Sequence, residues 1–187
     1  MQSLNLDGVE SSYRANDYGA LFYALVRTHR PRLVVELGTY MGYSALHMAA
    51  AIRDDVSMAM TPIFCIDMWD QYPHRHCSRQ DARSADWPAT VDVRFPQADV
   101  TDPVTAYAFQ DGSIDLLQAV FDAWRWKLSP DALVIIEGGS AERDRVEWMV
   151  KYGKKSIRDW LASEYVSSNF TWVTLDPFPS VTLMRPK

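Results

Sequence analysis

The sequence predicts one α/β domain over residues 1–187, built on a mostly parallel β-sheet with helices on its faces. Strand-like and helix-like segments alternate along the chain, which is typical of parallel sheets. No repeat, low-complexity tract or Gly/Ser linker divides it. With 48% apolar and 23% charged residues, the composition is that of an ordinary soluble domain, and the length suffices for one core.

The elements follow from local patterns. The first 30 residues form an N-terminal helical segment, because apolar residues from 18 to 26 keep a helical spacing and Pro31 ends the helix. Short, nearly continuous apolar runs predict strands that are buried on both faces. Strands are expected at residues 33–37, 63–66, 91–95, 114–117 and 133–136. Helices are expected at residues 11–30, 44–52, 103–109, 119–128, 140–152 and 154–165.

Two segments differ from this alternation. Residues 70–89 are polar and without a period, so we expect a long loop with at most a short helix, of the kind that is often functional. The last two strands, 170–175 and 181–184, are separated by only a short turn with two prolines. A connection this short joins antiparallel neighbours, so a C-terminal antiparallel hairpin is expected.

Charge and cysteine content exclude several classes of protein. The net charge of −5 argues against nucleic acid as the main partner, since phosphate contacts need a basic surface. Two cysteines cannot form a disulfide framework, and Cys65 is expected in the core. We find no signal-peptide pattern and no apolar run long enough to span a bilayer, so we expect a cytoplasmic protein without a membrane partner.

The turn after the first strand, residues 36–42, has the features of a nucleotide-binding turn. In open α/β sheets, ligands bind at the carboxyl ends of the strands. Gly38 permits a sharp turn, and Gly42 lets the backbone approach a ligand closely. The helix that begins next favours an anionic group at its start.

Acidic residues end the next two strands. Asp67 is placed to accept hydrogen bonds from both hydroxyls of a ribose, and Asp99 from an exocyclic amino group. Met68 and Trp69 follow Asp67 and are expected against an adenine ring. A dinucleotide turn has glycine where this chain has Glu36, whose carboxylate would repel a pyrophosphate but attract an amino group. The turn therefore favours S-adenosylmethionine over NAD.

Residues 34–46, VVELGTYMGYSAL, resemble motif I of class I S-adenosylmethionine-dependent methyltransferases, and especially that of catechol O-methyltransferase and its relatives. Residues 66–69, IDMW, and 113–117, SIDLL, look like small bacterial enzymes that O-methylate sugars and antibiotics. The resemblance covers residues 15–186. It implies a Rossmann-like three-layer sandwich whose mostly parallel sheet has seven strands, including the C-terminal hairpin.

The resemblance also implies a set of cofactor-binding residues. The methionine end of S-adenosylmethionine would be bound by Glu36, Gly38, Thr39, Tyr40, Gly42 and Ser44. The ribose would bind Asp67, and the adenine would contact Met68, Trp69 and Asp99.

The sequence departs from this family after Leu117, where the acidic segment of its metal-dependent relatives is missing. A base that removes the acceptor's proton is expected among Glu137, His74 and His76, and Glu137 is best placed because it ends a central strand. The sequence leaves open whether the protein uses a magnesium ion, because the several oxygen ligands that such an ion needs cannot be identified in it. The charge run at residues 142–145 is interpreted as a solvated helix start.

These features predict methyl transfer from S-adenosylmethionine to a hydroxyl of a small molecule, such as a sugar or secondary metabolite, by a protein that forms a homodimer. One alternative is a non-catalytic or degenerate S-adenosylmethionine-binding module, and another is a NAD-dependent oxidoreductase.

Overall fold

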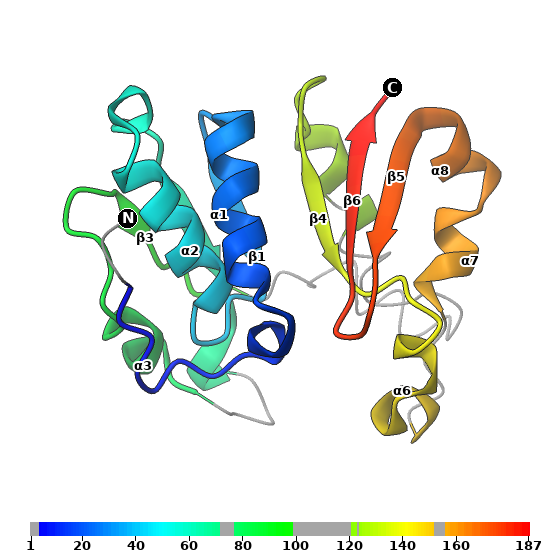
Figure 1. Cartoon of the computed structure of the whole chain (residues 1–187), viewed down its shortest axis with the longest axis horizontal. Helices are drawn as coiled ribbons and strands as arrows, with labels where there is room; N and C mark the ends of the chain where they lie inside the picture. Colours follow the sequence, from blue (N-terminus) through cyan, green and yellow to red (C-terminus); the bar gives the residue numbers. More distant parts are fainter. Residues whose placement is uncertain (1–3, 72–76, 99–120, 123, 152–155) are drawn as a thin grey trace. The chain divides into compact units, whose positions relative to one another are not determined.

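The computed structural model describes residues 4–71, 77–98, 121–122, 124–151 and 156–187 (Figure 1). The chain divides into two compact units, Met1–Val100 and Thr101–Lys187. The single domain over the whole chain stays a prediction. None of the described helices is long and apolar enough to cross a membrane.

The described strands of the first unit form a parallel sheet in the order β1-β2-β3: β1 (Val34–Leu37), β2 (Ile63–Ile66) and β3 (Val93–Arg94). The first two strands confirm the prediction, and the third is shorter than predicted. It starts late because the N–H of Val91 closes a turn onto the carbonyl of Pro88. The parallel arrangement brings Gly38 and Asp67 to one edge of the sheet, where the Gly38 N–H donates to the carbonyl of Ile66 over 2.9 Å.

The described helices of the first unit are η1 (Ser12–Asn16), α1 (Tyr18–His29), α2 (Tyr43–Arg53), η2 (Val56–Met58), η3 (Trp69–Gln71) and α3 (Arg79–Arg83). Helices α1 and α2 pack side by side (Figure 1). Gly19 makes this possible, because a Cβ there would lie 2.2 Å from the His47 ring. The single helix predicted over residues 11–30 is interrupted at Asp17, whose φ of 51° is left-handed.

The second unit contains an antiparallel sheet in the order β4-β6-β5: β4 (Val134–Glu137), β6 (Val181–Pro186) and β5 (Phe170–Leu175). Strands β5 and β6 confirm the predicted C-terminal hairpin (Figure 1). Phe121 packs edge-to-face on both Trp160 and Phe170, and these rings form a core with Leu161 and Met184. Such burial is the main stabilising contribution in a unit of this size.

The helices predicted in the second unit are shorter than expected. The helix predicted over 140–152 is replaced by η5 (Arg143–Arg145) and α6 (Glu147–Lys151), because the backbone is extended at Val146. The helix predicted over 154–165 is replaced by α7 (Ile157–Leu161) and α8 (Glu164–Asn169). Ser163 caps α8 by accepting from the N–H of Val166, so a new helix starts there.

Only part of the helix predicted over 119–128 is described, and it ends in η4 (Arg125–Lys127). The predicted helix at 103–109 and the predicted strand at 114–117 lie outside the described residues.

Candidate functional site

The loop between β1 and α2 turns sharply through three left-handed residues. Gly38, Tyr40 and Gly42 have φ values of 80°, 53° and 84°. Glycine takes such angles without strain, whereas a tyrosine does so at a cost. A Cβ on Gly38 would meet no atom within 4 Å, so there is open space beside the loop. A Cβ on Gly42 would lie 2.8 Å from the ring of Trp87, so Gly42 is needed for packing as well.

Glu36 carries a buried carboxylate just before this turn. Its Oε1 accepts a hydrogen bond from the hydroxyl of Ser44. Its Oε2 is buried and has no hydrogen-bond partner among the described residues. Burial raises the pKa of Glu36 to about 7, and the negative charge of Asp67 adds to the rise, while the hydroxyl groups of Ser44 and Thr39 oppose it. An incompletely paired buried carboxylate costs free energy, so this group is suited to pairing with a cation.

Asp67 ties the end of β2 to the same loop. Its Oδ2 accepts from the N–H of Tyr40 over 2.7 Å, and its Oδ1 accepts from the N–H of Trp69 over 3.2 Å. The side chain is only half-buried. Because each carboxylate oxygen can accept more than one hydrogen bond, both oxygens keep the capacity to bind further donors.

Trp69 lies under the loop and is only 2% exposed. Its indole N–H donates to the carbonyl of Tyr40 over 2.9 Å, and its ring packs with Cys77 and Phe95. An indole buried in this way presents almost no face to a ligand. The contact of Trp69 with an adenine therefore stays a prediction, since the ring packs against residues of the protein itself. Met68, the other predicted adenine contact, is half-buried.

Two other segments of the chain contact the loop in ways that no motif could predict. The N-terminal segment packs Val9 against Tyr43, and the hydroxyl of Tyr40 donates to Glu10 over 3.3 Å. Trp87, from the segment that the sequence predicts as a long loop, packs on Gly42. None of these contacts carries a sequence signal, since they reach the loop from distant parts of the chain.

The candidate catalytic residues are only partly described. Glu137 is the last residue of β4 in the second unit, and its side chain is exposed. His74, His76 and Asp99 lie outside the described residues. Within the described parts of the chain, no three His, Cys, Asp or Glu side chains are grouped in a way that could hold a metal ion, so no residues are assigned to magnesium.

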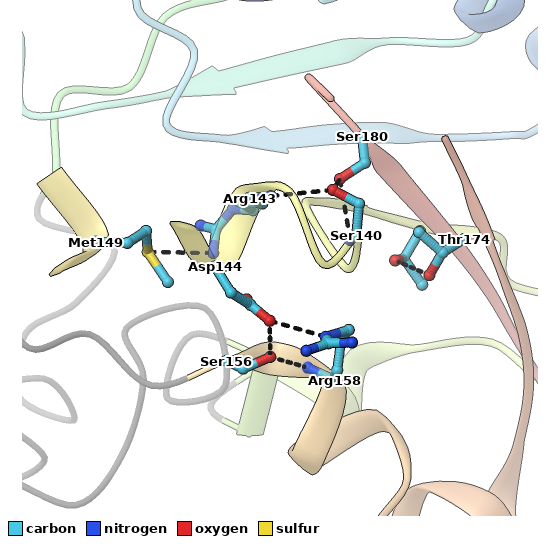
Figure 2. Close-up of polar contacts among 9 residues, drawn as sticks. Ser140, Arg143, Asp144, Met149, Ser156, Arg158, Thr174 and Ser180 are labelled. Carbon is cyan, nitrogen blue, oxygen red and sulfur yellow. Dashed lines mark hydrogen bonds and ion pairs between the residues drawn. The ribbon is translucent and has the colours of Figure 1, made fainter. Parts of the chain in front are cut away.

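The structure corrects the interpretation of residues 142–145 as a solvated helix start at one position, Arg143, whereas Glu142 and Arg145 are exposed. Arg143 is only 4% exposed, and its guanidinium lies 3.5 Å from the sulfur of Met149 (Figure 2). The backbone N–H of Arg143 donates to the hydroxyl of Ser140, and this hydroxyl also accepts from the hydroxyl of Ser180. Arg143 is buried because Gly138 has no side chain, and a Cβ there would lie 2.2 Å from it.

Comparison with known proteins shows the family of proteins to which this chain belongs. A family model described as a methyltransferase domain matches residues 35–138, which is more than half of the chain and includes both the loop and Asp67. This match is the finding that establishes the family.

Solved structures share the fold at low sequence identity. The SAH-bound methyltransferase PaMTH1 of Podospora anserina is 16% identical, with a TM-score of 0.60 over 97% of this chain and 81% of that one. The O-methyltransferase TomG of Streptomyces achromogenes, in complex with SAM, is 16% identical, with a TM-score of 0.58 over 100% and 92%. CalS11, a TDP-rhamnose 3′-O-methyltransferase, is 14% identical, with a TM-score of 0.52 over 95% and 87%.

These likenesses show an α/β methyltransferase-like fold with a parallel sheet. The loop at residues 36–44, Asp67 at the end of the next strand, and the family match together lead to one conclusion: the chain belongs to the methyltransferase domain family.

Proposed function

We propose that this protein binds S-adenosylmethionine at the loop after β1 and transfers its methyl group to a hydroxyl of a small molecule. The observation that carries the proposal is the carboxylate of Glu36, whose Oε2 is buried and has no partner among the described residues. Two residues later, open space lies beside Gly38. A folded protein retains a costly group of this kind where a ligand pairs with it.

The charge of the site favours this cofactor over a dinucleotide. The methionine end of S-adenosylmethionine carries an ammonium group, which would pair with Glu36 and satisfy its buried oxygen. A pyrophosphate would instead be repelled by Glu36. Two structural neighbours support the proposal, since TomG is in complex with SAM and PaMTH1 is bound to SAH.

The other predicted contacts are proposed on the same basis. Asp67 would accept hydrogen bonds from the ribose hydroxyls with the capacity left after it binds the backbone N–H groups of Tyr40 and Trp69. Met68 and Asp99 would contact the adenine. The methionine end would lie along Glu36, Gly38, Thr39, Tyr40, Gly42 and Ser44.

Methyl transfer needs an oriented hydroxyl and a proton acceptor. When bound, S-adenosylmethionine would supply an electrophilic methyl group on a positively charged sulfur, and that sulfur would keep the electron pair of the broken carbon–sulfur bond. We propose Glu137 as the base that takes the hydroxyl proton, with His74 and His76 as the other candidates. CalS11 acts on TDP-rhamnose, which supports a sugar as one class of acceptor. No step is assigned to magnesium.

We further propose the complete seven-stranded sheet within one domain, and a homodimer in solution. The alternation of strand and helix patterns supports the sheet. The resemblance of the sequence to small O-methyltransferases supports both.

The direct test is methyl transfer itself. The protein would be incubated with S-adenosylmethionine labelled in the methyl group and a panel of sugars, nucleotide sugars and phenols, with Glu137→Gln as a paired variant. Labelled product from the wild type, lost in Glu137→Gln, supports the proposal and its base. Cofactor binding without turnover of any acceptor favours the alternative, a non-catalytic module. Binding of NAD in place of S-adenosylmethionine would overturn both.

A further inference from the structure

We propose that Trp69 is a positioning residue, which holds the carboxylate of Asp67 in the orientation that receives the ribose of the cofactor. This inference rests on the proposed function of the site. It gives Trp69 a role that depends on its buried indole rather than on a stacking face.

Two residues around Asp67 adopt backbone angles that are unfavourable for their type. Tyr40 has a φ of 53° and Trp69 a φ of 40°, and neither is a glycine. Bulky residues enter the left-handed region rarely and keep it only where surrounding contacts hold them. Strain of this kind concentrates at functional sites.

The contacts that hold these two residues form a closed ring. The N–H of Tyr40 donates to Oδ2 of Asp67 over 2.7 Å, and the N–H of Trp69 donates to Oδ1 over 3.2 Å. The indole N–H of Trp69 closes the ring by donating to the carbonyl of Tyr40 over 2.9 Å. Each of the three residues is thus bonded to the other two, and both oxygens of the carboxylate are directed by the backbone.

Burial makes this ring rigid on the side of Trp69. The indole is 2% exposed and packs with Cys77, Ala82 and Phe95. The backbone of Asp67 is held as well, because its carbonyl accepts from the N–H of Ala98 over 3.0 Å. The carboxylate itself stays half-buried. The arrangement therefore fixes the orientation of Asp67 while leaving it accessible to a ligand.

Loss of the indole N–H would open the ring at one point. The carbonyl of Tyr40 would lose its donor, and the peptide that binds Asp67 Oδ2 would be less restrained. Hydrogen bonds to ribose hydroxyls depend on direction, so a carboxylate that samples several orientations binds them less well. The effect on binding would pass through Asp67 and would require its carboxylate.

The test is a double-mutant cycle measured by calorimetric titration with S-adenosylhomocysteine. Trp69→Phe keeps an aromatic ring and removes the donor, and we expect its affinity to fall about five- to tenfold. In the Asp67→Asn background, the same Trp69 substitution is expected to change affinity less than about twofold, because the group through which it acts is gone. Tyr23→Phe is the matched control, since it removes a hydrogen bond of 3.0 Å to Asp54 at the opposite end of α2.

An equal loss of affinity in both backgrounds would overturn the proposal, because it would mean that Trp69 only supports the fold. Unchanged affinity in Trp69→Phe would overturn it as well. Absence of binding by the wild type would instead count against the proposed function. Should Trp69→Phe fail to fold, hydrogen exchange of the Trp69 indole proton in the wild type replaces the cycle. The ring of hydrogen bonds predicts slow exchange that becomes slower still with bound ligand. Exchange as fast as in a free indole would contradict the proposal.

Discussion

Replacing Glu36 by glutamine is expected to stabilise the ligand-free protein by up to about 3 kcal/mol at pH 8 and by less than about 1 kcal/mol at pH 5. The wild-type carboxylate is buried, and its Oε2 has no partner among the described residues. The charged form is therefore disfavoured in the folded protein. Glutamine has a similar shape and carries no charge at either pH, so it removes this cost.

The magnitude follows from the pKa of Glu36, which burial raises from 4.5 to about 7. Raising a pKa by one corresponds to about 1.4 kcal/mol, so ionising Glu36 costs the folded state up to about 3 kcal/mol. Because the folded pKa lies above the unfolded one, the stabilising effect of the bound proton is complete below pH 4.5 and is lost as the pH rises through 7. The difference between wild type and Glu36→Gln should grow across this window.

The assay is urea unfolding of both proteins at pH 5 and pH 8, compared through the free energy of unfolding. Asp92→Asn is a matched control of opposite sign. The hydrogen bond with Arg94 lowers the pKa of Asp92, so this variant should not gain stability at pH 8. Equal stability of wild type and Glu36→Gln at pH 8, or a difference that does not change with pH, would refute the reasoning.

Three further substitutions test separate parts of the structure. Gly42→Ala should lower the free energy of unfolding by at least about 1 kcal/mol in urea, because a side chain there needs a φ of 84° and meets Trp87 at 2.8 Å; wild-type stability would contradict this packing. Ser180→Ala should cost about 1–3 kcal/mol, since its buried hydroxyl accepts from the N–H of Ser140 over 3.2 Å, and a thermal melt of the variant checks this. Asp67→Ala should abolish S-adenosylhomocysteine binding by a folded protein in calorimetry, whereas normal affinity would remove Asp67 from the site.

Much of the first unit could be predicted because its signals are local. The apolar runs that become β1 and β2 are short and continuous, and the carboxyl ends of parallel strands meet at one edge of a sheet. These two facts are enough to place Glu36 and Asp67 near the same edge of the sheet, on neighbouring strands. The structure adds that Asp67 accepts directly from the backbone of the loop, at Tyr40.

Other features could not be predicted because they depend on distant contacts. Nothing in the sequence indicates that Trp69 faces the protein rather than a ligand, since its neighbours Cys77 and Phe95 come from other segments. The burial of Arg143 depends on its packing against Gly138 across a turn. The start of α8 has a sequence signal, because Ser163 is a favourable N-cap residue. The apolar pattern over residues 154–165 nevertheless favours a single helix.

The central claim is that Glu36 pairs with the amino group of a bound cofactor, and calorimetric titration with S-adenosylhomocysteine at pH 8 and pH 6 tests it most directly. We predict micromolar binding at pH 8 and about tenfold weaker binding at pH 6, because a proton with a pKa of about 7 must first leave Glu36. Glu36→Gln should bind weakly at both pH values. No binding heat up to millimolar ligand, or wild-type affinity that is equal at the two pH values, would contradict the claim.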